Sequence, residues 1–319
     1  MTSEEGDAGI LGRGPSASSR SGDRAFGAPS ASGCAVWGVL NVTPDSFSDG
    51  GAFEAVDTAL THARRLLSEG ADVIDVGGES TRPKGRTYGE GYDVVPVEVE
   101  LARVLPVVEA LAGLGATISI DTVKPAVADA ALRAGARYVN DTGCGRDEAL
   151  VDVVASHGAE LVLMHNRGRG EVSGNNVLYG DVVEDVIREL EAAADRAIRR
   201  GVRESSLWLD PGLGFAKTAR QSTELLSGLP RLVALGRPVL VGASRKSFLA
   251  ELAPRPDGSR PGPLERVGGT VVTCAAAVAY GARAVRVHDV EIMRQAVLVA
   301  EALFRGPGSA FGPVTGGDS

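Results

Sequence analysis

Short apolar runs alternate with longer amphipathic segments along most of the chain. The apolar runs are rich in β-branched residues, as expected for parallel strands buried on both faces, and cover residues 35–40, 72–76, 117–120, 138–139, 160–164, 207–209, 238–241 and 284–287. Apolar residues at three-to-four spacing predict helices over 54–69, 97–114, 125–134, 148–156, 182–200, 221–229, 264–280 and 290–304. This alternation favours a single (β/α)8 TIM barrel, with a doubly wound sheet as the alternative, because strand count alone does not establish closure.

The two ends of the chain lack this alternation. Residues 1–33 are rich in Gly, Ser and Ala and contain no apolar signal-peptide core, while residues 306–319 are rich in Gly and Pro. Such segments cannot bury enough apolar surface to order themselves. We therefore expect disordered tails on either side of one α/β barrel domain over residues 34–305.

Composition narrows the classes of function. The 319 residues carry a net charge of -8 without a sustained Lys/Arg cluster, so nucleic acid is not an expected partner, although a small anion could bind where a few cations converge. No apolar run approaches the roughly 18 residues of a membrane span. The 3 cysteines, Cys34, Cys144 and Cys274, are far apart, which argues against a disulfide framework and fits a reducing cytoplasm.

Polar and ionisable residues follow nearly every predicted strand. In a barrel of this class, the carboxyl ends of the strands meet on one rim, where the chemistry is placed. One Asp or Asn there could merely cap the next helix, and a lone His such as His165 is more often structural than catalytic. A set spread over all the strands indicates convergence on one mouth: Asn41, Glu79, Asp121, Asn140, Asp141, His165, Asp210, residues 244–246 and residues 286–289.

These rim groups differ in chemistry. Asp121, Asn140 and Asp210 offer carboxylate and amide edges suited to a flat heterocycle with N–H donors and ring acceptors. Asn41 offers a neutral oxygen that could bind a Mg²⁺ still carrying waters and diphosphate oxygens. The cations suit phosphate or developing negative charge, and they are Arg286, His288 and Lys246. The rim therefore predicts a substrate with a heterocycle at one end and a diphosphate at the other.

Two loops after the first two predicted strands are long and polar. They cover residues 43–51 and 77–93, with glycines at their bases. Such loops could close over the mouth and exclude water from a reactive intermediate, and a solvated surface loop is the alternative.

Five motifs resemble the signatures of the dihydropteroate synthase family of pterin-binding enzymes. They lie in the family's order within residues 35–304 and read NVTPDSFSDGG (41–51), GESTRP (78–83), DPGLGF (210–215), SRKSFL (244–249) and RVHDV (286–290). The resemblance implies a transferase of folate biosynthesis on a (β/α)8 barrel. It would condense 6-hydroxymethyl-7,8-dihydropterin diphosphate with p-aminobenzoate in an SN1-like reaction with Mg²⁺ as cofactor.

The resemblance also implies roles for individual residues. The pterin would be held by Asp121, Asn140, Asp210 and Lys246, and the diphosphate by Asn41, Arg286 and His288, with Asn41 also a ligand of the metal. The aminobenzoate pocket would be framed by Phe47, Thr81, Pro83, Phe215 and Ser247. The residues with a catalytic role would be Asp121, Lys246, Asp49 and Arg82.

The chain departs from the family pattern in three places. It has TGCG over residues 142–145 instead of a Ser-Gly-Gly type turn, Asn166 where a second methionine is common, and a longer second loop. The first two leave the pterin-binding acids intact. The longer loop bears on the aminobenzoate pocket and hence on sulfonamide sensitivity.

Two alternatives stay open on the sequence alone. A catalytically silent paralogue would bind pterin without turnover. A pterin-dependent corrinoid methyltransferase would share the barrel and the acids, but it would not need the motifs at 244–249 and 286–290, because its substrate carries no diphosphate. The expected partners are small-molecule substrates, and the family resemblance implies a homodimer through the late helices.

Overall fold

The computed structural model describes residues 33–42, 52–79, 95–168 and 177–306. The predicted disordered tails lie almost wholly outside the described residues. So do five residues that the family resemblance places in the site, namely Phe47, Asp49, Thr81, Arg82 and Pro83. The described part covers the predicted barrel domain apart from segments of three loops.

Eight parallel strands form the centre of the molecule: β1 (Ala35–Asn41), β2 (Val73–Gly77), β3 (Ile118–Asp121), β4 (Tyr138–Asp141), β5 (Glu160–Met164), β6 (Leu207–Asp210), β7 (Leu240–Val241) and β8 (Ala284–Val287). From β1 to β6 each strand pairs with the next, and β8 pairs with both β7 and β1. Between β6 and β7 a parallel bridge joins Leu209 to Val239. The prediction of a (β/α)8 barrel is confirmed, because the first and last strands are neighbours, unlike those of a doubly wound sheet.

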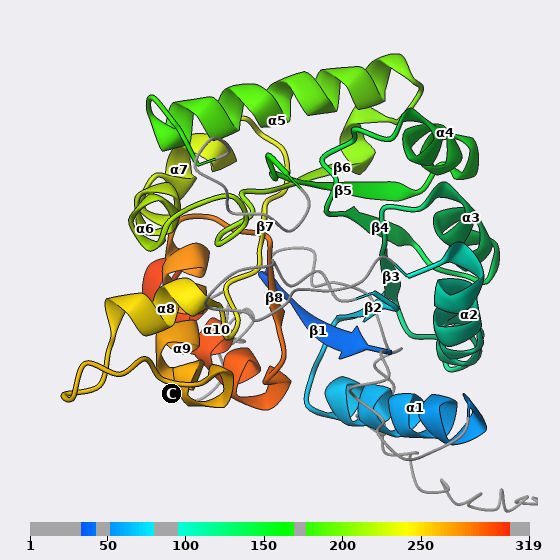
Figure 1. The fold of residues 1–319 in the computed structure, drawn as a ribbon, viewed down its shortest axis with the longest axis horizontal. Helices are drawn as coiled ribbons and strands as arrows, with labels where there is room; N and C mark the ends of the chain where they lie inside the picture. Colours follow the sequence, from blue (N-terminus) through cyan, green and yellow to red (C-terminus); the bar gives the residue numbers. More distant parts are fainter. Residues whose placement is uncertain (1–32, 43–51, 80–94, 169–176, 307–319) are drawn as a thin grey trace, which may run out of the picture.

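Helices surround these strands on the outside (Figure 1). They are α1 (Ala52–Ser68), α2 (Val97–Gly113), α3 (Pro125–Arg133), α4 (Glu148–His157), α5 (Val182–Arg199), α6 (Ala219–Ser227), α7 (Leu229–Val233), α8 (Ser247–Leu252), α9 (Val267–Ala279) and α10 (Val290–Phe304), with short 3-10 turns η2 (Glu204–Ser206) and η3 (Pro263–Arg266). Seven of the eight predicted helices match these bounds to within two residues at each end.

The differences lie in the second half of the barrel. The predicted helix over 221–229 ends at Ser227, and the separate helix α7 starts at Leu229. Pro230 explains the break, because a proline inside a continuous helix removes a backbone donor and clashes with the preceding turn. The predicted start at 264 falls in η3, and α-helical geometry begins only at Val267. Helix α8 is not predicted, because its 6 residues are too few to establish a helical period.

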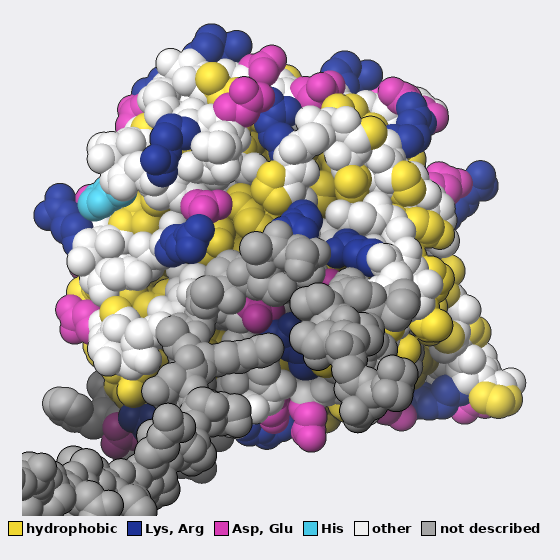
Figure 2. Space-filling model, turned by 180° about the vertical axis from the view of Figure 1, so that it is seen from behind, with side chains coloured by type: hydrophobic (Ala, Val, Ile, Leu, Met, Phe, Trp, Pro, Cys, Tyr) yellow, Lys and Arg dark blue, Asp and Glu magenta, His cyan; other side chains and the backbone are white. Residues whose placement is uncertain are grey.

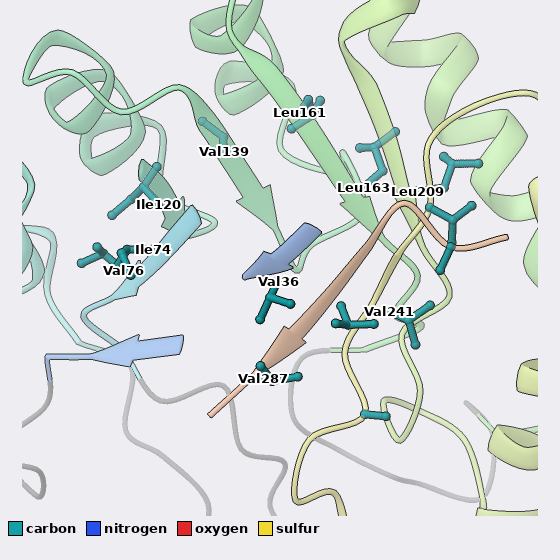
Figure 3. Packing of buried hydrophobic residues seen from close by; sticks show 14 of the residues in the cluster. Val36, Ile74, Val76, Ile120, Val139, Leu161, Leu163, Leu209, Val241 and Val287 are labelled. Atoms are coloured by element: carbon teal, nitrogen blue, oxygen red, sulfur yellow. The ribbon is translucent and has the colours of Figure 1, made fainter. Parts of the chain in front are cut away.

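One face of each strand packs against the helices and forms the main hydrophobic core. Figure 3 shows this layer, which includes Val36 on β1, Ile74 and Val76 on β2, and Leu161 and Leu163 on β5, all fully buried. Because residues two apart on a strand share a face, the residues between them point into the barrel.

Three aromatic rings fill the amino-terminal end of the barrel interior. Trp37, Tyr138 and Trp208 belong to a hydrophobic cluster separate from the main core. The centre of the Trp37 ring lies 4.9 Å from that of Tyr138 and 5.8 Å from that of Trp208, and the other two are 5.9 Å apart. Tilted and edge-on ring contacts at these distances are favourable, so this end of the barrel is closed by apolar packing.

The surface and the cysteines agree with the sequence analysis. Figure 2 shows positive and negative side chains mixed over the face that it displays. In the parts of the chain that the structure describes, no helix is both long enough and apolar enough to cross a membrane. The three cysteines are buried and free, as their isolated positions predict.

Candidate active site

The inward-facing residues change from apolar to polar toward the carboxyl ends of the strands. On β4 the aromatic Tyr138 is followed on the same face by Asn140, and on β6 Trp208 is followed by Asp210. On β2 the corresponding polar residue is Asp75, and all three polar side chains are buried. The mouth of the barrel is therefore lined by polar groups that the protein shields from water.

Arg286 joins two carboxylates from other strands. Its Nε donates to Asp75 Oδ2 at 2.5 Å, and its Nη2 donates to Asp121 Oδ2 at 2.7 Å. Asn140 Nδ2 also donates to Asp75 Oδ2, at 3.1 Å. Since Arg286 lies on β8 and the two acids lie on β2 and β3, these groups can meet only inside the barrel.

Burial and pairing act in opposite directions on these charges. Burial raises the pKa of Asp121 to about 7, and the positive charge of Arg286 opposes that rise. Burial disfavours the charged form of Arg286, but Asp75 and Asp121 outweigh it and raise the pKa of the guanidinium above its ordinary value. The mouth therefore holds a permanent cation beside a carboxyl group that titrates near neutral pH.

Asp210 and Lys246 form a second charged group. Asp210 Oδ1 accepts a hydrogen bond from Gly212 N at 2.7 Å, and Lys246 Nζ donates to Leu213 O. The ammonium nitrogen lies 4.5 Å from the centre of the Phe215 ring, within the range of a cation–π contact. Burial raises the pKa of Asp210 and lowers that of Lys246 to about 8, and each charge partly offsets the effect on the other.

Gly242, just after β7, marks the place where the two charged groups converge. A Cβ atom added there would lie 3.8 Å from Arg286 Cβ, 3.9 Å from Asp210 Oδ2 and 3.9 Å from Lys246 Nζ. Glycine at this position leaves room among three charged side chains, as expected where a ligand approaches the backbone.

Asn41 and His288 lie on the same rim. A Cβ atom added at Gly77 would lie 3.6 Å from Asp121 Cβ and 3.8 Å from Asn41 Oδ1, so the Asn41 amide oxygen is presented beside Asp121. His288, just beyond β8, contacts Ser244 Oγ through Nδ1 at 3.0 Å.

Several buried polar atoms at the mouth have no hydrogen-bond partner among the described residues. An unpartnered buried polar group costs about 1–3 kcal/mol, and native proteins keep few of them. Here the four lie on neighbouring strands: Asp75 Oδ1, Ser119 Oγ, Asp121 Oδ1 and Asn140 Oδ1. Their concentration in one place indicates a site for a polar ligand.

A family model described as pterin binding enzyme matches residues 37–288 of the chain. This range runs from β1 to His288 and includes all of the rim groups described above. The chain belongs to the pterin-binding enzyme family. Among members of this family, the dihydropteroate synthase of Synechocystis sp. is 46% identical over 272 residues, which cover 85% of this chain and 90% of that protein.

Solved structures of pterin-binding enzymes share the fold. The dihydropteroate synthase of Xanthomonas albilineans with 4-aminobenzoic acid has a TM-score of 0.76 at 42% identity, covering 85% of this chain and 93% of that one. The same enzyme in complex with 7,8-dihydropteroate has a TM-score of 0.74 at 40% identity, covering 85% of this chain and 94% of that one. The family resemblance inferred from the five motifs is confirmed.

The structure brings together most of the residues that the family resemblance assigns to the pterin and the diphosphate. The converging set consists of Asn41, Asp121, Asn140, Asp210, Lys246 and Arg286, with His288 on the rim next to Ser244. For the aminobenzoate, Phe215 lies against Lys246, and Ser247 begins helix α8 directly after Lys246. The remaining assigned residues lie outside the described part, and the roles of all of these residues stay predictions.

Two interior residues of this pterin-binding enzyme are not predicted by the motifs. Asp75 lies two residues before Gly77, and Ser119 lies two residues before Asp121, so each shares the inward face of a strand-end position. The signal in the sequence is a polar residue inside an otherwise apolar run. The sequence does not single out Asp75, because the run over 72–76 predicts only a buried strand.

Both ring nitrogens of His165 have partners within the protein. Its Nε2 lies 3.0 Å from Glu189 Oε2, and its Nδ1 lies 2.8 Å from Lys217 Nζ. Burial and the charge of Lys217 lower its pKa to about 4, although Glu189 opposes this. The imidazole is therefore neutral at neutral pH.

Proposed function

We propose that the chain catalyses the dihydropteroate synthase reaction: 6-hydroxymethyl-7,8-dihydropterin diphosphate and p-aminobenzoate give 7,8-dihydropteroate and diphosphate. The observation that carries the proposal is the set of buried, unpartnered polar atoms at the mouth, on Asp75, Ser119, Asp121 and Asn140. A pterin ring presents N–H donors and acceptor atoms along its edges and would supply the missing partners. The names of the similar proteins support the same reaction.

The pterin lies deepest in the mouth in this proposal. Asp121 and Asn140 bind one edge of the ring, while Asp210 and Lys246 bind from the opposite side of the barrel. In this proposal the ring lies near Gly242, where Asp210, Lys246 and Arg286 converge. Because Lys246 is held by Leu213 O and the Phe215 ring, it can donate to a ring acceptor without first being ordered.

The diphosphate lies toward the rim. Arg286 is a permanent cation whose fork-shaped guanidinium can bind phosphate oxygens, and His288 adds a second donor. In the structure Arg286 is paired with Asp75 and Asp121. Binding of the substrate anion would draw part of its charge away from Asp121, and this leaves that carboxylate available to the pterin.

Mg²⁺ is the proposed cofactor, with Asn41 as its protein ligand. Among the described residues, no group of three or more His, Cys, Asp or Glu could hold a metal ion by itself. A single amide oxygen from Asn41 fits Mg²⁺, which commonly keeps several waters and binds one or two protein oxygens together with substrate phosphates. When bound, Mg²⁺ would supply Lewis-acid neutralisation of the leaving diphosphate.

The proposed mechanism is dissociative. The bond between the pterin methylene carbon and the diphosphate oxygen breaks first, and its electron pair leaves with the diphosphate, which Arg286 stabilises. The positive charge left on the pterin is delocalised over the ring and stabilised by ionised Asp121. The neutral aniline nitrogen then forms the new C–N bond and loses a proton to water. Exchange between pterin diphosphate and labelled diphosphate that strictly required the amine would contradict this order.

The aminobenzoate approaches from the rim. Phe215 and Ser247 are the described residues of this pocket, and Phe215 has an apolar ring that can pack against the aminobenzoate. Phe47, Thr81, Arg82 and Pro83 are also assigned to this pocket by family resemblance, and Asp49 is assigned to the first loop with a catalytic role. These five residues lie outside the described residues.

We also infer that the protein is a cytoplasmic homodimer. The isolated, free cysteines support a reducing compartment. Helices α9 and α10 carry large apolar side chains that are exposed in the single chain, including Val272 at 68% and Leu303 at 71%. Helices α9 and α10 pack against each other, and exposed apolar side chains on neighbouring helices are typical of protein–protein interfaces, so a second copy of the chain would cover them.

The deciding experiment measures diphosphate release by the purified protein with pterin diphosphate and Mg²⁺, with and without p-aminobenzoate. We expect diphosphate release that depends on p-aminobenzoate, together with formation of 7,8-dihydropteroate. Tight pterin binding without turnover would instead identify a silent paralogue. Activity that depended on a corrinoid would identify a methyltransferase.

A further inference from the structure

Lys217 is a buried cation that the proposed chemistry does not use. It lies between β6 and α6, seven residues after Asp210, and is 4% exposed. Burial lowers its pKa to about 7, as does the nearby charge of Lys246, whereas Asp210 opposes the shift. An ammonium group in such a place needs acceptors from the protein itself.

Those acceptors come from two separate segments. Lys217 Nζ lies 3.0 Å from Phe215 O and 3.1 Å from Gly212 O in its own loop. It also lies 2.8 Å from His165 Nδ1 and 3.4 Å from His165 O, just beyond the end of β5. The side chain therefore ties residues 211–216 to the neighbouring strand end.

A second chain of contacts supports the same segment. Because His165 Nδ1 accepts from the ammonium, the ring proton is on Nε2 and is donated to Glu189. Glu189 is paired with Arg167, whose guanidinium carbon lies 3.7 Å from the centre of the Tyr179 ring. The Tyr179 hydroxyl donates to Ala216 O at 3.0 Å, which returns the chain of contacts to the segment.

The backbone of this segment requires such support. Gly212, Gly214 and Ala216 have φ values of 64°, 78° and 47°, and an alanine in this region is strained. A Cβ atom added at Gly212 would lie 2.0 Å from His165 O, so the loop runs tightly against the end of β5. Strained backbone persists only where its surroundings hold it in place.

We propose that Lys217 is a positioning residue for the pterin end of the site. By holding residues 211–216 against His165, it fixes Leu213 O and the Phe215 ring, the two groups that orient Lys246 Nζ, and it keeps the Gly212 amide on Asp210. Lys217 itself touches neither substrate. The inference rests on the proposed function only for the identity of the ligand.

The test compares Lys217→Met with Arg294→Met. Methionine keeps most of the aliphatic stem of Lys217 and removes its donors. Arg294 is the control, because it too is a cation that donates to a loop carbonyl, that of Gly70. It lies at the opposite end of the barrel, where it also donates to Asp72. Steady-state kinetics with both substrates and thermal unfolding are measured for each variant.

Lys217→Met should raise KM for pterin diphosphate by about tenfold or more and KM for p-aminobenzoate by less than about threefold, because Asp210 and Lys246 are both assigned to the pterin, whereas Phe215 is the single aminobenzoate residue in the displaced segment. Arg294→Met should lose stability without this split. Equal effects of Lys217→Met on both KM values, or kinetics like those of Arg294→Met, would overturn the proposal. If the methionine variant does not fold, Lys217→Arg takes its place: a smaller but still selective rise supports the proposal, and wild-type kinetics contradict it.

Hydrogen exchange without substrate separates this inference from the proposed function. The amides of residues 212–216 should exchange faster in Lys217→Met than in the wild type, whatever reaction the protein catalyses. In Arg294→Met their exchange rates should equal those of the wild type. Unchanged exchange in Lys217→Met would contradict the positioning role of Lys217, even if the enzyme is active. If the wild type shows no turnover but exchange is still faster in Lys217→Met, the positioning role is supported and the proposed reaction is contradicted.

Discussion

At the residue scale, Asp121 is where burial and pairing oppose each other most directly. Its folded-state pKa of about 7 lies above the ordinary value of 3.8, so between these values the folded protein binds more protons than the unfolded chain. Its contribution to stability therefore falls as pH rises through that window. Asp121→Asn resembles the neutral carboxyl, so between pH 5 and pH 8 its free energy of unfolding should rise relative to wild type by on the order of 3 kcal/mol.

Urea unfolding at several pH values checks this prediction. Trp37 and Trp208 provide the fluorescence signal from the other end of the barrel, so the substitution does not disturb the probe. His165 titrates with the opposite sign, since its lowered pKa costs stability as pH falls below its ordinary value, but it does so equally in both proteins. A difference between variant and wild type that stayed flat with pH would contradict the raised pKa.

Asp75 and Ser119 give a second prediction at this scale. Asp75→Asn removes one of the two carboxylates that neutralise buried Arg286, and disrupting a buried ion pair in this way costs about 3 kcal/mol or more. Ser119→Ala removes a hydroxyl without a partner among the described residues, so the free energy of unfolding should stay nearly unchanged or rise slightly. Urea unfolding of ligand-free protein compares the two, and equal losses would show that the Ser119 hydroxyl is satisfied in the folded protein.

At the element scale, the loop from β6 to α6 is expected to be the least tolerant of change. Gly212→Ala places a Cβ atom at 2.0 Å from His165 O, and Gly236→Ala, at a similar positive φ of 80°, meets nothing within 4 Å. Both variants carry the backbone strain of roughly 1 kcal/mol, but only Gly212→Ala must also displace the loop. Pterin affinity should fall at least about tenfold in Gly212→Ala and stay near wild type in Gly236→Ala. Titration calorimetry with the pterin substrate measures both, and equal affinities would contradict the tight packing of the loop.

The elements themselves follow closely from the sequence, because helical spacing and β-branched runs are local signals. The strands over 160–164 and 284–287 have the predicted bounds, as does the helix over 290–304. The errors have local causes too: Pro230 splits one helix, and α8 is too short to show a period. Closure of the barrel could not be predicted in this way, since the pairing of β1 with β8 joins segments about 250 positions apart and depends on the arrangement of all eight strands.

At the scale of the whole molecule, the site arises from a gradient along the barrel interior, apolar around Trp37 and polar around Asp121. The sequence predicts the residues at the mouth because those follow the predicted strands. It does not predict Asp75, whose partner Arg286 is 211 positions away, or Lys217, whose partner His165 is 52 positions away. Such contacts are set by the tertiary fold, and no local pattern contains them.

The proposed homodimer makes a prediction about the assembled molecule. Val272 on α9 and Leu303 on α10 are each more than two-thirds exposed in the single chain, and burying a charge there would leave it without a partner. The double variant Val272→Glu, Leu303→Glu should weaken self-association by roughly 100-fold, or about 2.7 kcal/mol. Leu114→Glu is the control, because Leu114 is also an exposed apolar residue, at 43%, but it follows α2. Light scattering across a concentration series should give the mass of one chain for the double variant and of two for the control. A double variant that stays dimeric would show that the interface lies elsewhere than on α9 and α10. A monomeric wild type would contradict the homodimer itself.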